Sequence, residues 1–349
     1  MGITVQFLLA GGAAFVAAAA LIPLLARVAA GYGVIAAPSP DRLHDTPTPY
    51  LGGLAIVITA CAVAPFLNDW KPEATIVLLA AAGVGAVGLI DDVRTVRPWK
   101  RLVVEALAAT IAAAAGARVD LLNGPLDWVI TVAWLVGVTN AYNLVDNMDG
   151  AAGVIASTTA LALALAAGLE GQVLVGGLAA VLSGASIGFL VYNWHPARIF
   201  MGDAGSLFLG FLLGVIALEL RFPVAHHTAS VGAVVLLTGP ALFDTTLVVI
   251  SRARAGQPVY LGGVDHTSHR LLRLGLHPVV VVTLLGLASA ACCGLGVAVG
   301  RGSLPVAPVF GATVVLGLGL LVALLRVEVP TTDGAPSPAN LAPSAAAGA

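Results

Sequence analysis

The chain has 349 residues, of which 59% are hydrophobic and only 10% are charged, and its formal net charge is −2. This composition lies outside the range of soluble globular domains and gives no reason to expect a nucleic-acid partner. The fold class that it predicts is all-α, a polytopic membrane helix bundle. The three cysteines, Cys61, Cys292 and Cys293, lie in apolar runs without metal-ligand spacing, which indicates packing roles.

Apolar segments follow one another along most of the chain. Because about 20 apolar residues cross a bilayer core, we expect about 10 to 11 transmembrane helices. The candidate segments are Val5 to Arg27, Leu51 to Leu67, Ala74 to Ile90, Leu102 to Ala117, Trp128 to Tyr142, Ala151 to Leu169, Val173 to Tyr192, Ser206 to Leu220, Ala229 to Ile250, Pro278 to Val299 and Val306 to Leu325. No basic residue precedes the first segment, so we expect an uncleaved span there. Residues 1–327 should form one integral membrane domain, and residues 328–349 a disordered cytoplasmic tail.

Basic residues indicate the orientation of these segments, because cytoplasmic loops carry an excess of Lys and Arg. The odd loops and the start of the tail contain Arg27, Arg42, Arg94, Arg97, Lys100, Arg101, Arg198, Arg252, Arg254, Arg270, Arg273 and Arg326. The even loops contain only Lys71, Arg118, Arg221 and Arg301. We therefore expect a multi-pass protein of the cell (inner or plasma) membrane, with its N-terminus outside and, if there are eleven spans, its C-terminus in the cytoplasm.

The polar clusters of the sequence all fall on the side that this orientation makes cytoplasmic. They are Asp41 to Gly53, Asp91 to Arg101, Asn140 to Gly150, Asn193 to Ser206 and Arg252 to Arg273. Five convergent polar loops on one face predict catalytic cytoplasmic loops that form an active site at the membrane surface.

Three of these clusters contain acids suited to phosphate and metal chemistry. Asp91 and Asp92 end the third segment beside several basic residues, and paired carboxylates there suit a site for phosphates and a divalent metal; the alternative is a solvated helix end. Asp149 and Asp203 each precede or open an apolar segment, so each alternatively caps a helix. Small residues around Asp203 would let backbone amides approach an anion.

Histidines mark two further loops. His266 and His269 lie three residues apart beside Arg270, without the soft ligands of a zinc site, so substrate contact or proton transfer is the expected role. His44 lies in a similar polar loop.

Taken together, five blocks resemble the polyprenyl-phosphate N-acetylhexosamine-1-phosphate transferase family, in its order, across residues 38–275. The blocks are His44 with Pro47 to Pro49 and Gly52-Gly53, Asp91-Asp92, Asn140 to Asn143 with Asp146 to Gly150, Pro196 to Ser206, and Pro240 with Asp244, Arg252 and Asp265 to Leu271. The resemblance implies transfer of N-acetylhexosamine 1-phosphate, GlcNAc 1-phosphate in the most similar branch, from a UDP-N-acetylhexosamine to polyprenyl (undecaprenyl or decaprenyl) phosphate in the membrane. UMP would be released, Mg2+ would be required, with Mn2+ as an alternative, and lipid-linked cell-wall glycan synthesis would begin.

The resemblance also implies residue roles. Asn143 and Asp203 match residues that hold Mg2+, Asp91 matches one that deprotonates or positions the lipid phosphate, and Asp92 would support both. The positions that match substrate contacts are Arg101, in place of a lysine at the lipid phosphate; Asp146 and Asp149, on the nucleotide side; His266, His269 and Arg270, in the loop that meets the sugar and diphosphate; and His44.

The sequence departs from the family at several positions. Ala36, Asp41 and Tyr50 stand where an Asp, a basic residue and an Arg are common, and Thr267 and Ser268 occupy a stretch that often carries another histidine. A phospho-N-acetylmuramoyl-pentapeptide transferase therefore remains an alternative. A secondary transporter of an anionic solute is the alternative from another class, although no segment has an acid at its centre. The sequence leaves a homodimer open.

Overall fold

The computed structural model describes residues 2–36, 47–223, 227–260 and 262–329, which are mostly helical. Helices satisfy every backbone polar group within one segment, as an apolar environment requires. In chain order they are α1 (Ile3–Gly31), α2 (Gly52–Val63), η1 (Ala64–Phe66), α3 (Pro72–Val93), α4 (Pro98–Ala114), α5 (Leu126–Val145), α6 (Ala151–Leu169), α7 (Val173–Asn193), α8 (Gly202–Glu219), α9 (His227–Leu237), α10 (Gly239–Arg254), α11 (Thr267–Arg273), α12 (Pro278–Gly300) and α13 (Val306–Leu325). The antiparallel strands β1 (Ile35–Ala36) and β2 (Thr48–Pro49) pair between α1 and α2.

Each predicted apolar segment corresponds to a helix or, for Ala229 to Ile250, to the pair α9 and α10, which is bent by 73°. The all-α membrane fold is confirmed. In the part of the chain that is described, eight helices are long and apolar enough to cross a membrane, or nine if the bent pair forms one span. This is fewer than the predicted ten to eleven. Helix α2 has only 12 residues, about 18 Å of rise, and α4 carries Lys100, Arg101 and Glu105 near its start.

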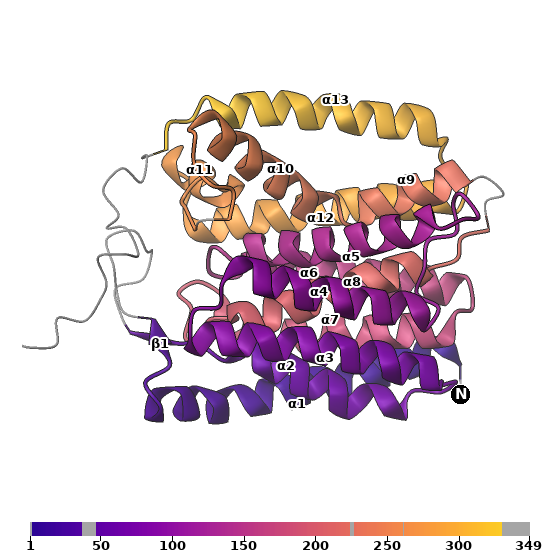
Figure 1. Ribbon diagram of the computed structural model, residues 1–349, viewed down its shortest axis with the longest axis horizontal. Helices are drawn as coiled ribbons and strands as arrows, with labels where there is room; N and C mark the ends of the chain where they lie inside the picture. The colour runs from indigo at the N-terminus through magenta and orange to yellow at the C-terminus, as the bar shows by residue number, and fades with distance from the viewer. Residues whose placement is uncertain (1, 37–46, 224–226, 261, 330–349) are drawn as a thin grey trace, which may run out of the picture.

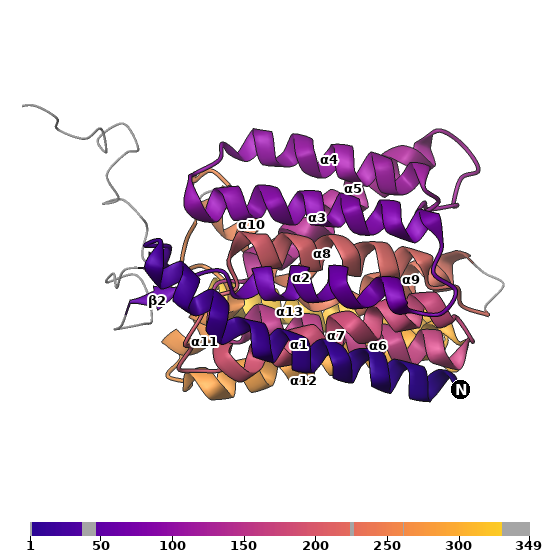
Figure 2. The ribbon, with the colours of Figure 1, turned by 90° about the horizontal axis from the view of Figure 1, so that it is seen from below.

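Helix α8 forms the centre of the bundle. It packs against α3 and α5 and also contacts α2, α6 and α7, and most of its side chains are buried. Other long helices pack around it (Figures 1 and 2), and α13 lies at the edge of the bundle in Figure 1, with only Leu321 and Leu324 buried. Small residues let these helices approach closely: a side chain at Gly184 of α7 would collide with the backbone of Gly11 in α1.

The long helices alternate in direction along the molecule, so the polar clusters gather at one end. This end contains the strands, α11, the carboxyl ends of α3, α5, α7 and α10, and the amino ends of α2, α4, α6 and α8 (left in Figure 1). The fold thus brings together the described parts of all five predicted polar loops. The cytoplasmic assignment of this end stays a prediction from loop charge.

Candidate active site

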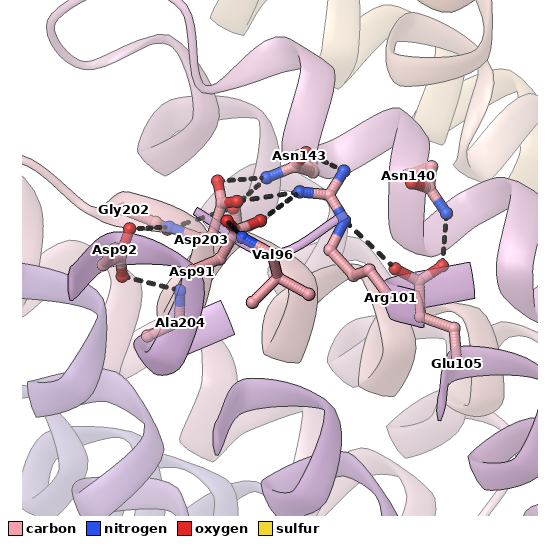
Figure 3. Close-up of polar contacts among 11 residues, drawn as sticks. Asp91, Asp92, Val96, Arg101, Glu105, Asn140, Asn143, Gly202, Asp203 and Ala204 are labelled. Atoms are coloured by element: carbon pink, nitrogen blue, oxygen red, sulfur yellow. Dashed lines mark hydrogen bonds and ion pairs between the residues drawn. The ribbon is translucent and has the colours of Figure 1, made fainter. Parts of the chain in front are cut away.

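Arg101 contacts three of the other predicted site residues (Figure 3). Its Nη1 lies 2.8 Å from Oδ2 of Asp203 and 3.2 Å from Oδ2 of Asp91, and its Nη2 donates to Oδ1 of Asn143 at 3.1 Å. Asn143 in turn donates to Oδ1 of Asp203 at 2.8 Å and to Oγ of Ser206 at 3.0 Å. Helices α3, α4, α5 and α8 therefore bring the predicted residues Asp91, Arg101, Asn143 and Asp203 into direct contact.

Asp92 points to a different set of partners from its neighbour Asp91. Its two carboxylate oxygens accept the backbone N–H groups of Asp203 at 2.8 Å and Ala204 at 3.1 Å. A carboxylate in this place caps the amino end of α8 and complements its dipole. Asp203 does not cap its own helix, so its carboxylate remains in the site. Asp92 thus holds the backbone that carries Asp203.

The turn before α8 depends on a glycine at one position. Gly202 has a φ of +73°, in the left-handed region, and a Cβ there would lie 2.7 Å from the carboxylate oxygens of Asp92. The same turn is anchored to α2, because the N–H groups of Gly52 and Gly53 donate to the carbonyls of Phe200 and Met201, each at 2.9 Å. These contacts fix the amino end of α8 from two sides.

Asp146 lies just beyond α5, partly buried beside the same turn, and accepts the backbone N–H of Gly202. Burial, followed by the charges of Asp203 and Asp92, raises the pKa of Asp146 to about 8. Asp146 is therefore mostly protonated near pH 7, and a cation bound beside these carboxylates would favour its ionised form.

Asp149 is buried away from the guanidinium of Arg101. Its Oδ2 lies 2.8 Å from Nδ1 of His195 and accepts the N–H of Ala197 at 3.0 Å. The amino cap of α6 is its neighbour Gly150. Asn193 supports the same loop by accepting the N–H of Gly150 at 2.9 Å and donating to the carbonyl of Ile199 at 2.8 Å. In this conformation Asp149 stabilises the loop from His195 to Ala197, and its predicted nucleotide contact stays a prediction.

The histidine loop is joined to the candidate site through the end of α5. Ser268 hydrogen-bonds through its hydroxyl to Oδ1 of Asn147, and Nδ1 of buried His266 lies 2.8 Å from Oδ2 of Asp244 in α10. His269 is only partly buried, with its ring 5.8 Å from that of His266. Burial and then the neighbouring His266 lower the pKa of His269 to about 4, so its imidazole is neutral near pH 7.

Arg270 makes several hydrogen bonds within the protein. Its side chain is 2% exposed, and it donates to the carbonyls of Asp265, Leu324 and Val327 and to the hydroxyl of Ser251. These bonds join α11 to the end of α13 and use four of the five N–H groups of a guanidinium. In this conformation Arg270 stabilises the packing of α11 against the end of α13, and its predicted substrate contact stays a prediction. The predicted substrate contact His44 lies outside the described residues.

Comparison with known proteins identifies the family. Residues 74–221, which carry Asp91, Arg101, Asn143 and Asp203, match the profile of glycosyl transferase family 4. A Bacillus subtilis protein named as an undecaprenyl-phosphate N-acetylglucosaminyl 1-phosphate transferase is 32% identical over 280 residues, which cover 76% of this chain and 78% of the relative. This chain belongs to glycosyl transferase family 4.

Other members of glycosyl transferase family 4 are similar over comparable lengths. The decaprenyl-phosphate N-acetylglucosaminephosphotransferase of Mycobacterium tuberculosis is 30% identical, over 86% of this chain and 84% of the relative. A phospho-N-acetylmuramoyl-pentapeptide-transferase of Heliobacterium modesticaldum is 31% identical, over 64% of this chain and 80% of the relative. With its apolar helices, these similarities make the chain a multi-pass membrane member of the family.

Two residues of this family 4 site carry no role in the sequence-based assignment. Glu105 is 1% exposed, accepts a hydrogen bond from Nδ2 of Asn140, and has its Oε1 3.6 Å from Nε of Arg101. A signal was present in the sequence, because Glu105 is an acid within an apolar helix, four residues after Arg101. Its partner Asn140 could not be identified without the packing of α4 on α5.

The donor set around Arg101 suits a hard divalent cation. Within the described ranges, no group of three or more His, Cys, Asp or Glu side chains has a metal-binding arrangement. The oxygens of Asp91, Asp203 and Asn143 nevertheless all face one cationic group, the Arg101 guanidinium. Carboxylate and amide oxygens are the ligands that Mg2+ prefers, so the chemistry of these residues fits that ion.

Proposed function

We propose that the protein transfers N-acetylglucosamine 1-phosphate from UDP-N-acetylglucosamine to a polyprenyl phosphate, undecaprenyl or decaprenyl, and releases UMP. The observation that carries the proposal is the meeting of Asp91, Asn143 and Asp203 around Arg101 at one end of a membrane helix bundle. The relatives similar over most of the chain are named for this reaction, which supports the same donor and acceptor here.

The reaction exchanges one phosphorus–oxygen bond for another. An oxygen of the lipid phosphate attacks the phosphorus that carries the sugar, and the bond from that phosphorus to UMP breaks. A phosphate monoester has its second pKa near 6, so the lipid phosphate is already mostly dianionic at neutral pH. Asp91 therefore acts mainly by positioning this phosphate, and proton removal is a minor requirement.

Neutralisation of charge is the main task, because three anionic groups meet in this reaction. Arg101 supplies a fixed positive charge and two Nη edges that can donate to phosphate oxygens. Asp203 and Asn143 would hold Mg2+, or Mn2+ as an alternative, which when bound stabilises charge on the diphosphate. Asp92 keeps Asp203 in place through the first turn of α8.

The nucleotide side of the site would be formed by Asp146 and the loop that Asp149 supports, and the sugar side by His266 and His269. The site lies at one end of the helix bundle, a position that suits one lipid substrate and one soluble substrate. We assign this end to the cytoplasm of the cell membrane, where UDP-sugars are made.

The site also bears on two alternative functions. A phospho-N-acetylmuramoyl-pentapeptide transferase would use the same phosphate chemistry, and the pair Thr267-Ser268 between the two histidines favours the simpler sugar donor. A transporter would place its coupling acids near the membrane midplane. Here Asp91, Asp203 and Glu105 all lie at the end of the bundle where α4 and α8 begin.

The test uses the purified full-length protein in nanodiscs with undecaprenyl phosphate, Mg2+ and UDP-GlcNAc labelled in the sugar. We expect the label to enter the lipid phase with one UMP released per sugar transferred. Label that stays aqueous while UDP-N-acetylmuramoyl-pentapeptide is consumed would show that the pentapeptide transferase is the right assignment. Accumulation of solute in proteoliposomes without UMP release from any donor would show a transporter.

A further inference from the structure

Glu105 is a buried acid that the proposed reaction does not use directly. It lies in α4, and its Oε2 accepts from Nδ2 of Asn140 in α5, while its Oε1 lies 3.6 Å from Nε of Arg101 (Figure 3). Asn140 is fixed in turn, because its Nδ2 also donates to the carbonyl of Val136 at 2.9 Å. Burial of a carboxylate costs much free energy unless it is paired, so these contacts are what keeps an acid at this position.

Helices α4 and α5 run in opposite directions, and two pairs of polar side chains connect them. Arg101 of α4 meets Asn143 of α5, and one turn further in, Glu105 of α4 meets Asn140 of α5. Arg101 and Glu105 are four residues apart and lie on the same face of α4. Glu105 therefore touches the edge of the guanidinium that faces away from Asp91 and Asp203.

A guanidinium is planar and presents its donors in a fixed fork, so holding one edge sets the direction of the other. The Nε edge of Arg101 faces Glu105, and the two Nη groups face Asp91, Asn143 and Asp203. Without the negative charge of Glu105 beside Nε, the guanidinium of Arg101 would be attracted only to the carboxylates of Asp91 and Asp203. It would then neutralise them and lose the orientation that a phosphate needs.

We infer that Glu105, held by Asn140, is a positioning residue that sets the orientation and the charge balance of Arg101 for the phosphate of the lipid substrate. This inference rests on the proposed function. Glu105 itself does not touch substrate, because its side chain is 1% exposed and is covered by Arg101 and Asn140. Its whole effect on turnover must pass through the guanidinium.

The test is a double-mutant cycle on the full-length protein in nanodiscs, with KM and kcat measured for each substrate. Glu105→Gln keeps the shape and can still accept from Asn140 but removes the charge beside Nε. We expect its KM for polyprenyl phosphate to rise about tenfold, the scale of one charge-assisted interaction, with little change in KM for UDP-GlcNAc. Arg101→Ala should raise the same KM, and Glu105→Gln should have no further effect in the Arg101→Ala background, because coupled residues are not additive.

The matched control is Glu219→Gln, the same substitution in a half-buried acid at the far end of α8, about 24 Å along the helix from Asp203. It should leave both KM values unchanged. Glu105→Asp, which keeps the charge, should recover part of the loss. If Glu105→Gln does not fold, Asn140→Ser, which weakens the support of Glu105 and keeps its charge, should raise the same KM by a smaller factor.

An equal loss for both substrates, or the same loss with and without Arg101, would show that Glu105 only stabilises the fold. If the wild type transfers the sugar phosphate and Glu105→Gln has the same KM and kcat values, this inference is wrong and the proposed function stands. Absence of transfer by the wild type would overturn the proposed function and this inference with it.

Discussion

The carboxylates of Asp91, Asp92 and Asp203 divide into two groups by what they face. Those of Asp91 and Asp203 face the guanidinium of Arg101, whereas that of Asp92 accepts backbone N–H groups of α8. Only the first group has oxygens directed into the site. Asp91 and Asp203 would therefore act on phosphate and metal, whereas Asp92 would hold the backbone of Asp203 in place. Single substitutions should separate these roles by their effects on turnover and stability.

Asp203→Asn is the substitution that tests the metal and charge role most directly. It keeps the size of the side chain and removes its charge, so we expect turnover to fall at least about hundredfold, the scale seen when a stabilising group is removed from a catalytic site. UMP release measured over a range of Mg2+ concentrations reports this loss. Expression, monodispersity and melting temperature should stay close to the wild type. Near-normal turnover would remove Asp203 from the site.

His269 makes a prediction about pH, because burial lowers its pKa to about 4. The unfolded histidine has a pKa of about 6.5, so between these values the unfolded chain binds more protons than the folded chain. The contribution of His269 to stability is fully present above pH of about 6.5 and is lost as the pH falls towards 4. His269→Gln should therefore lose less stability than the wild type between about pH 7.5 and pH 5.

Thermal unfolding in detergent at the two pH values measures this difference. The control is Thr95→Ala at an exposed position, which removes no titratable group and should keep the pH dependence of the wild type. Equal falls in melting temperature for His269→Gln and the wild type would mean that the folded protein does not hold His269 neutral.

At the scale of elements, the amino end of α8 is the part on which the site depends. The carboxylate of Asp92 satisfies two of the backbone N–H groups that this helix end leaves free. Asp92→Ala leaves both without that partner in a buried place, and we expect a loss of about 2 kcal/mol in the free energy of unfolding. Turnover should fall as well, because Asp203 lies in the same turn.

Chemical unfolding and UMP release measured on the same preparation test this expectation. Asp120→Ala, at an exposed position between α4 and α5, is the matched control and should change neither quantity. A stable Asp92→Ala variant with no turnover would show instead that Asp92 acts on substrate.

The elements themselves were largely predictable from the sequence, and the partners of the acids were not. Segment length and hydropathy are local properties, so each apolar segment matched a helix, although α2 proved too short to pass as a span. The pairing of Glu105 with Asn140, and the capture of Arg270 by carbonyls at the end of α13, arise from contacts between helices distant in the sequence. Charge and spacing indicate that such residues matter, and only the packing decides which group each one meets.

At the scale of the whole molecule, alternation of helix direction gathers the candidate residues at one end. That end also receives most of the basic residues of the chain, which is the pattern expected for a cytoplasmic face. Loop charge thus links a property of the sequence to the side from which a soluble nucleotide would reach the site. The orientation can be tested separately from activity.

Cysteine labelling in intact cells provides that test. Cys61, Cys292 and Cys293 are replaced by alanine, and a single cysteine is then introduced at exposed Thr95, between α3 and α4, or at exposed Ser303, between α12 and α13. These positions lie at opposite ends of the bundle. If the site end faces the cytoplasm as proposed, a membrane-impermeant maleimide should label Ser303→Cys in intact cells and Thr95→Cys only after lysis. Both should be labelled in lysed membranes, and the reverse pattern in intact cells would place the site outside and remove its access to cytoplasmic UDP-sugars.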